Sequence, residues 1–287
     1  MQIALIQDRM IPLNDLDPVY LDRGLYFGDG VYEVLRSYNG RLFALDEHLQ
    51  RFANSLAAIG IEGVNLDQVR AKVVGAFHAS GLSNAKIYFH ITRGCGPRDL
   101  FTKARLEPTF FLTVMELGDS SLEKTKGIAV STFPDLRWRR CDIKSLNLLP
   151  NVLARRDAMQ KGCDEAILVN DSGLITEGAA SSFFGVFERS AGPGGRREYY
   201  AQTAPLTANI LSSVTRLFVI QAAQDLGIPV VEQAFAPEQA KAAKELIMAV
   251  TTKDIVPIVR FEDQLIGDGR PGPVTGRLAK EFKKFTV

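Results

Sequence analysis

Residues 137–150 read RWRRCDIKSLNLLP, a stretch that sets Lys144 among apolar neighbours just before a helix-like run. Ile143 and Leu146 lie on either side of the lysine, and three arginines precede it. Partial burial lowers the pKa of a lysine and makes its amine a nucleophile, and nearby arginines either add to that effect or hold an anion. The other interpretation is a solvated basic strand, because structural charges outnumber catalytic ones. The rest of the chain decides between them.

The composition is that of an ordinary globular protein. The chain has 287 residues, of which 46% are hydrophobic and 23% are charged, and it suits one large domain or two smaller ones that share a cleft. A net charge of +1 gives no indication of a nucleic acid or an anionic membrane as partner. No apolar run reaches membrane-spanning length, and the N-terminal segment lacks the basic start of a secretion signal. The expected location is therefore the cytoplasm.

Cysteines and histidines do not indicate a metal site or a disulfide framework. The cysteines are Cys95, Cys141 and Cys163, an odd number without a C-x-x-C pair, which favours a reducing compartment. The chain has three histidines, and they show no close pairing. We therefore expect no metal.

The first part of the chain predicts a small domain of strands and two helices. The expected elements are strands at 31–38 and 41–45 around an Asn39-Gly40 turn, helices at 46–60 and 66–82, and strands at 85–94 and 108–116. Asp46 is the expected cap of the first helix. The segment 94–108 reads as a polar loop marked by glycine and proline, and loops of this length are often functional.

The second part predicts a larger domain, and the fold class is α+β. Residues 118–126 lack apolar periodicity and are expected to link a smaller N-terminal domain, 1–117, to a larger C-terminal domain, 127–287. The expected elements are a strand at 128–134, a helix at 150–162, strands at 165–170, 174–178 and 181–187, a loop at 189–200, a helix at 212–227, two strands within 245–259, and a helix at 273–285.

Several segments besides Lys144 have side chains suited to a phosphorylated, flat ligand. Glu177 is followed by small residues that leave room for a ring, the segment 210–216 opens a helix with hydroxyl side chains, and 249–254 has two threonines where a strand breaks. Arg51 lies one turn after His48 and is able to reach an anion. Pyridoxal 5′-phosphate requires such a set: an amine, an acid for its ring nitrogen and an anion cradle. A turn-starting glutamate and an exposed helix arginine are the alternative interpretations.

The chain resembles the fold-type IV pyridoxal-phosphate enzymes, which include branched-chain aminotransferases, D-amino-acid transaminases and aminodeoxychorismate lyases. The resemblance runs through nearly the whole chain and is closest to the D-amino-acid transaminases. It is carried by DRGLYFGDGVYEV at 22–34, EHLQRF at 47–52, RWRRCDIKSLNLL at 137–149, KGCDEAIL at 161–168 and ITEG at 175–178. The match around Lys144 is the most specific, whereas the EHxxR pattern is shared more widely across the fold type.

The resemblance implies a role for individual residues. Lys144 resembles the Schiff-base lysine and proton carrier, and Glu177 the partner of the pyridine nitrogen. The implied cofactor contacts are Arg51, Thr215 with the N–H of Val214, and Thr251 at the phosphate, and Leu211 against the ring; Tyr32 and Arg98 lie on the substrate side. The family also implies a two-domain protein with its active site in the interdomain cleft. It further implies a homodimer, with the 93–105 loop contributed across the interface.

Three positions depart from the family pattern. D-amino-acid transaminases of the best-known type have Arg-x-His in the loop after TRG, and here the histidine position is Leu100, which cannot donate a hydrogen bond to a carboxylate. Ser182 replaces an asparagine and Ser213 replaces a glycine. Neither serine excludes the cofactor, because the backbone N–H groups remain, but carboxylate binding must differ.

The expected activity is transfer of an amino group from a D-amino acid to a 2-oxo acid of the 2-oxoglutarate or pyruvate type, by a ping-pong route with Lys144 as the proton carrier. Three alternatives remain open: an aminodeoxychorismate lyase, an (R)-amine transaminase and a non-catalytic binding protein. Leu100 favours the (R)-amine transaminase, because an amine substrate needs no firm carboxylate-binding site.

Overall fold

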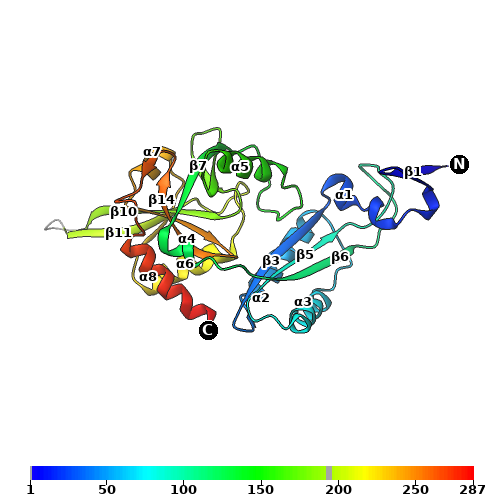
Figure 1. The fold of residues 1–287 in the computed structure, drawn as a ribbon, viewed down its shortest axis with the longest axis horizontal. Helices are drawn as coiled ribbons and strands as arrows, with labels where there is room; N and C mark the ends of the chain where they lie inside the picture. The colour runs from blue at the N-terminus through cyan, green and yellow to red at the C-terminus, as the bar shows by residue number, and fades with distance from the viewer. Residues whose placement is uncertain (1, 192–195) are drawn as a thin grey trace.

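The computed structural model describes residues 2–191 and 196–287 and shows two lobes, each built on its own β-sheet (Figure 1). Helices and strands are segregated within each lobe rather than strictly alternating along the chain. The expected α+β class with two domains is therefore confirmed. The limits 1–117, 118–126 and 127–287 stay a prediction.

The smaller lobe has an antiparallel sheet covered by two helices on one face (Figure 1). Its elements are β3 (Gly30–Tyr38), β4 (Arg41–Leu42), β5 (Ala85–Thr92), β6 (Thr109–Glu116), α2 (Leu45–Ala58) and α3 (Leu66–Ser80), with the strand order β4-β3-β5-β6. Leu35 and Phe89 on the sheet and Phe52 on α2 are fully buried together. Because side chains alternate along a strand, Tyr32 and Lys86 lie on the opposite face, which lines a cleft.

The hairpin around Asn39-Gly40 is confirmed, but its second strand is shorter than expected. Ser37 pairs with Leu42 and Tyr38 with Arg41, and pairing ends there. Ala44 then takes a left-handed backbone conformation with φ of 52° and becomes the residue before α2. The expectation that Asp46 caps this helix was therefore wrong, because the helix starts one residue earlier and Asp46 lies in its first turn.

The larger lobe is built on a mixed sheet with helices around it (Figure 1). Its strands are β7 (Ile128–Pro134), β8 (Glu165–Val169), β9 (Ile175–Gly178), β10 (Ser182–Ala191), β11 (Arg196–Thr203), β12 (Val230–Glu232), β13 (Glu245–Val250), β14 (Asp254–Phe261) and β15 (Gln264–Leu265). The spatial order is β12-β11-β10-β13-β14-β7-β8-β9, with β15 paired to β14. The helices are α5 (Leu149–Gln160), α6 (Val214–Asp225), α7 (Pro237–Lys241), α8 (Pro273–Phe282) and the 3₁₀ turn η3 (Lys283–Thr286).

Helix α6 matters for the site because its N-terminus lies beside the cleft. Ser213 caps it, and the serine hydroxyl accepts a hydrogen bond from the N–H of Arg216 at 3.1 Å. Val219 and Ala222 on its inner face are buried against Ile247 of β13. Burial of this face fixes the direction in which the helix start points.

Two segments expected to be irregular are ordered elements. The expected linker contains a helix, α4 (Ser121–Lys126), which packs on β14 and ends at Gly127 with φ of 78°. A Cβ at Gly127 would lie 2.3 Å from the side chain of Val259, so the close approach requires glycine. The expected loop at 189–200 is mostly strand, because β10 and β11 pair up to Ala191 and Arg196. The middle of this expected loop, 192–195, lies outside the described residues.

The N-terminal segment forms a hairpin and short turns that the sequence interpretation did not assign. They are β1 (Ile3–Ile6), β2 (Arg9–Pro12), the 3₁₀ turns η1 (Leu13–Asp15) and η2 (Pro18–Leu21), and α1 (Arg23–Phe27). Arg23 anchors the long loop that follows β5, because its guanidinium donates to the carbonyl oxygens of Asp99 at 2.6 Å and Leu100 at 3.2 Å. Across the described residues, none of the helices combines the length and apolarity needed to cross a bilayer.

Candidate active site

The two lobes enclose a cleft of about 600 Å³. This volume lies within the range of ligand pockets, roughly 300–1,000 Å³. The cleft is lined by six of the residues predicted from the sequence: Tyr32, Arg51, Lys144, Glu177, Leu211 and Thr251. These residues are far apart in the chain, and the structure brings them into one place.

Lys144 is half-buried, and backbone hydrogen bonds hold it against the smaller lobe. Its N–H donates to the hydroxyl of Ser55 at 3.1 Å, and its carbonyl oxygen accepts from the N–H of Tyr32 at 2.9 Å. The N–H of Leu146 donates to the carbonyl oxygen of Gly30 at 3.0 Å. The Lys144 amine lies 4.3 Å from the centroid of the Tyr32 ring. A basic strand open to solvent does not describe this position.

The candidate phosphate ligands gather where α6 begins. The guanidinium of Arg51 donates to the carbonyl oxygen of Ser212 at 2.9 Å, which fixes the arginine at the helix start. The hydroxyls of Thr215, from α6, and Thr251, from the turn after β13, lie 3.5 Å apart. A helix N-terminus with converging hydroxyls and an arginine is an arrangement that suits a phosphate group. Val214 lines a neighbouring pocket rather than the cleft, and its backbone N–H is the group that the resemblance places at the phosphate.

A buried carboxylate that sequence reasoning missed holds Arg51 in place. Glu33, which is 0% exposed, accepts two hydrogen bonds from Arg51, each of 2.7 Å, and a third contact of 2.7 Å joins it to Nδ1 of His48. Burial works to raise the pKa of Glu33, but Arg51 and then His48 outweigh it and hold the pKa at about 2. The sequence contained a signal for this buried carboxylate, because Glu33 alternates with Val31 and Leu35 and so falls on the buried face of β3.

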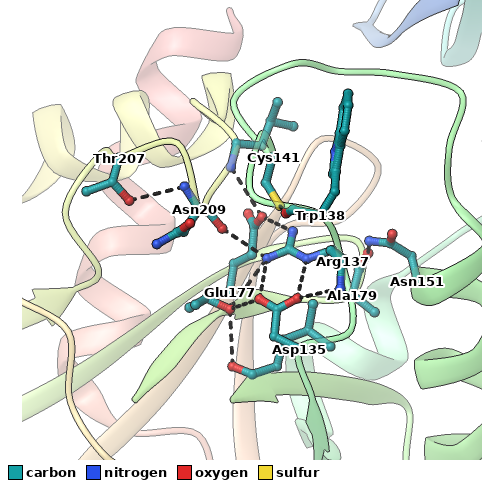
Figure 2. A network of polar contacts seen from close by, with 12 residues as sticks. Asp135, Arg137, Trp138, Cys141, Asn151, Glu177, Ala179, Thr207 and Asn209 are labelled. Atoms are coloured by element: carbon teal, nitrogen blue, oxygen red, sulfur yellow. Dashed lines mark hydrogen bonds and ion pairs between the residues drawn. The ribbon is translucent and has the colours of Figure 1, made fainter. Parts of the chain in front are cut away.

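Glu177 also lines the cleft and belongs to a network of charged side chains (Figure 2). Its Oε1 accepts hydrogen bonds from the guanidinium of Arg137 and from the N–H of Leu211, the latter at 3.2 Å. Burial raises the pKa of the Glu177 carboxyl, and the charge of Arg137 opposes the rise. The pKa of Glu177 therefore lies above its ordinary value, and the cationic neighbour Arg137 limits the rise.

The arginines before Lys144 were expected either to help activate the lysine or to hold an anion, and the structure pairs Arg137 with carboxylates of its own chain. Its guanidinium lies between the carboxylates of Asp135 and Glu177, as Figure 2 shows. Nε and Nη2 donate to the two oxygens of Asp135, each at 2.8 Å. Arg140 is likewise paired, with Asp142, in an exposed position. Both arginines are thus engaged by carboxylates of their own chain.

The cleft fits a flat, phosphorylated ring with a protonated nitrogen. Small residues, Ala179 to Ser182, line the wall next to Glu177 and leave room for a planar group. Asp135, Arg137 and Glu177 together have a net charge of −1, which a cation in the cleft would balance. The substituted Ser182 and Ser213 also line the cleft and do not block it.

Val214 and Thr215 lie at the start of α6 and are not among the residues that line the cleft. Arg98 and Leu100, on the loop after β5, do not line the cleft of their own chain either. Both side chains are exposed, Leu100 to 86%. The guanidinium carbon of Arg98 lies 6.0 Å and 5.7 Å from the ring centroids of Tyr26 and Phe27. Arg98 therefore makes no contribution to the lining of the cleft in its own chain.

Asp254 ties the two lobes together next to the threonine turn. It accepts hydrogen bonds from Arg36 at 2.6 Å and from the hydroxyl of Tyr38, both on β3, and from Lys124 of α4 at 2.7 Å. Arg36 also reaches the carbonyl oxygen of Thr252 at 3.4 Å. Asp254 has φ of 61°, a left-handed conformation that is uncommon outside glycine. The cleft is therefore held to a defined width near Thr251.

Comparison with known proteins gives consistent matches along the chain. A family model described as Amino-transferase class IV matches residues 30–261. The D-alanine aminotransferase of Bacillus licheniformis is 36% identical over 273 residues, which cover 95% of this chain and 93% of that protein. The D-alanine aminotransferase of Staphylococcus haemolyticus is 33% identical over 284 residues, covering 98% and 97%. The expected resemblance to D-amino-acid transaminases is confirmed.

Solved structures show the same fold. The branched-chain amino acid aminotransferase of Escherichia coli matches with a TM-score of 0.85 at 24% identity, covering 98% of this chain and 93% of that one. The T.th. branched-chain amino acid aminotransferase with pyridoxamine 5′-phosphate has a TM-score of 0.83 at 23% identity, covering 96% and 90%.

Proposed function

The chain belongs to the class IV aminotransferase family, and from that premise we propose that it exchanges amino groups between a D-amino acid and a 2-oxo acid. Pyridoxal 5′-phosphate is the proposed cofactor. When bound, it supplies a carbonyl for the substrate amine and an electron sink for the carbanion that forms at the α-carbon. The observation that carries the proposal is the half-buried amine of Lys144 in one cleft with Glu177 and the Arg51 and Thr251 side chains.

The chain's own residues would hold the cofactor at three points. Arg51, the Thr215 and Thr251 hydroxyls and the N–H of Val214 would bind the phosphate. Glu177 would accept a hydrogen bond from the ring nitrogen. Leu211 lines the cleft, and its N–H already holds Oε1 of Glu177, so its side chain would pack on the ring.

Lys144 would both bind the cofactor covalently through Nζ and move the reacting proton. The free Lys144 amine would accept the proton from the substrate α-carbon and later donate it again, so Lys144 would be both base and acid. The proposed route is ping-pong, with two half-reactions. Tyr32 lies 4.3 Å from the amine and would line the substrate side.

Carboxylate binding would depend on a second protomer. We propose a homodimer of cytoplasmic enzyme in which the 93–105 loop of one chain brings Arg98 to the cleft of its partner. Arg98 would then bind the substrate carboxylate without help from a histidine, because Leu100 occupies that position. The exposure of both side chains in one chain supports this proposal.

A panel of half-reactions tests the function. Purified protein is mixed with D-alanine, D-glutamate, L-leucine or (R)-1-phenylethylamine, and the cofactor absorbance is followed. We expect D-alanine or D-glutamate to convert the cofactor fastest. Fastest conversion by the (R)-amine would favour the amine transaminase, for which the Leu100 substitution is the specific observation, and pyruvate release from aminodeoxychorismate without an amino acceptor would indicate the lyase.

A further inference from the structure

We propose that Arg137 is a positioning residue that keeps Glu177 charged and directs one of its oxygens into the cleft, where it holds a protonated ring nitrogen. The inference rests on the proposed function, because it names the residue that makes Glu177 suitable for its partner. Arg137 acts through Glu177 and not on the reacting atoms.

The hydrogen bonds of Glu177 divide its two oxygens between two tasks. Oε1 accepts from Arg137 and from the N–H of Leu211. In residues 2–191 and 196–287, Oε2 makes no hydrogen bond with any side chain or backbone group, while Glu177 lines the cleft. An ionised carboxylate has about four acceptor positions, so Oε2 retains the capacity to accept from a donor in the cleft.

The guanidinium of Arg137 is fixed from the side away from Glu177. Asp135 accepts from Nε and Nη2, each at 2.8 Å, and the carbonyl oxygen of Asn209 accepts from Nη2 at 3.1 Å. The arginine side chain is 9% exposed. A planar fork held by a bidentate carboxylate has little freedom to rotate, so Nη1 stays directed at Glu177.

The charges around Glu177 favour a cation in the cleft. Arg137 and Lys144 are the cations that face it, and Asp135 lies on the far side of Arg137. Cys141, which contacts the same cluster, has its pKa raised to about 11 by burial and is neutral at neutral pH. Burial pushes the Glu177 carboxyl toward its neutral form, and Arg137 is the main opposing charge. Without Arg137, we expect Glu177 to be a weaker partner for a protonated ring nitrogen.

The protonation state of the cofactor's ring nitrogen can be measured directly and tests the effect of Arg137. The protein is loaded with pyridoxal 5′-phosphate labelled with ¹⁵N in the ring, and the nitrogen chemical shift is followed over pH in the wild type, Arg137→Met, Arg137→Lys and Arg140→Met. Arg140 is the matched control, because it also pairs with an aspartate but its side chain is 50% exposed. A shift in the titration of the nitrogen is a change that a purely structural role does not produce.

We expect a protonated nitrogen in the wild type and in Arg140→Met across the neutral range. In Arg137→Met the nitrogen should lose its proton at least about one pH unit lower, which corresponds to a tenfold change in proton affinity. The kcat should fall about tenfold or more with KM changed less. Arg137→Lys should recover part of both effects because it keeps the charge.

The outcomes separate the inference from the proposed function. If the wild type does not bind the labelled cofactor, the proposed function fails. If the wild type binds it protonated and Arg137→Met shows the same titration and the same kcat, or if lysine rescues nothing, the inference fails. Should Arg137→Met not fold, Arg137→Gln, which keeps a donor without the charge, makes the same comparison.

Discussion

The N–H of Tyr32 donates a hydrogen bond to the carbonyl oxygen of Lys144 at 2.9 Å, so the candidate catalytic lysine of the larger lobe is held by the central strand of the smaller one. The same contact brings the Tyr32 ring to within 4.3 Å of the amine. The position of Lys144 therefore depends on how the two lobes are arranged. Changes that loosen the contacts between the lobes are expected to affect catalysis.

Loss of Asp254 should loosen those contacts. Asp254→Asn leaves the buried Arg36, whose side chain is 10% exposed, without its carboxylate. Breaking a buried ion pair in this way costs roughly 3–5 kcal/mol. We expect a lower free energy of unfolding by chemical denaturation and weaker cofactor retention, because the Thr251 turn is no longer tied to β3. Glu238→Gln, which breaks a pair whose acid is 81% exposed, is the control and should cost ~0–1 kcal/mol.

An equal free energy of unfolding in Asp254→Asn and Glu238→Gln would show that the contacts of Asp254 do not hold the lobes together.

Glu33 should support cofactor binding through Arg51. Glu33→Gln removes the negative charge and replaces one of the two acceptor oxygens by a donor, so one hydrogen bond from the guanidinium is lost, and a hydrogen bond to a charged group is worth about 1.5–3 kcal/mol. We expect the Kd for pyridoxal 5′-phosphate to rise about tenfold or more. Asp46→Asn is the matched control, because Asp46 also pairs with an arginine but is 79% exposed. Spectrophotometric titration of the apoprotein measures both, and an unchanged Kd in Glu33→Gln would refute the support role.

Glu33 should also make the free energy of unfolding depend on pH in the acidic range. Its pKa is held at about 2 in the folded protein against an ordinary value of 4.5, so its contribution is complete above about pH 4.5 and is lost as pH falls through about 2. The wild type should therefore lose its advantage over Glu33→Gln between these values, by on the order of 3 kcal/mol. Denaturant melts at neutral pH and at about pH 3 check the sign. A stability difference between the wild type and Glu33→Gln that grows as the pH falls would contradict a lowered pKa of Glu33.

Arg98 should matter for amino acids and not for amines. Removing one partner of a buried charged pair costs roughly 2–5 kcal/mol, and removing one partner of an exposed pair costs ~0–1 kcal/mol. Arg98→Ala is expected to raise KM for D-alanine about tenfold or more, since about 1.4 kcal/mol corresponds to tenfold. A neutral (R)-amine has no carboxylate for Arg98 to bind and should be unaffected. Steady-state kinetics with both substrates decide, and equal effects on both, or none on either, would assign the carboxylate to another residue.

The elements that could be predicted from the sequence are those whose signal is local. Apolar spacing located α2 and α3, and the Asn39-Gly40 turn located a hairpin. Helix α4 was missed because its order comes from ion pairs with the larger lobe, such as Lys124 with Asp254, and not from an apolar face of its own. The strands β10 and β11 extend into a polar stretch because they pair with each other.

The same distinction applies to the site. Lys144 stood out through its neighbours, and Glu177 through the small residues after it. The partners that orient the site were missed, because Arg137 meets Glu177 and Arg51 meets Glu33 only after folding. Arg98 depends on a second copy of the chain in the proposed arrangement, and a single sequence does not contain that contact.

The central claim is that Lys144 binds the cofactor covalently, and borohydride reduction of the loaded protein followed by peptide mapping tests it most directly. Reduction fixes the cofactor to the amine that holds it. We expect the label on Lys144 alone, and Lys144→Ala should remain unlabelled and lose the yellow colour. Lys86 is the other lysine that lines the cleft within the described part of the chain. A label on Lys86, or on any lysine but Lys144, would contradict the account.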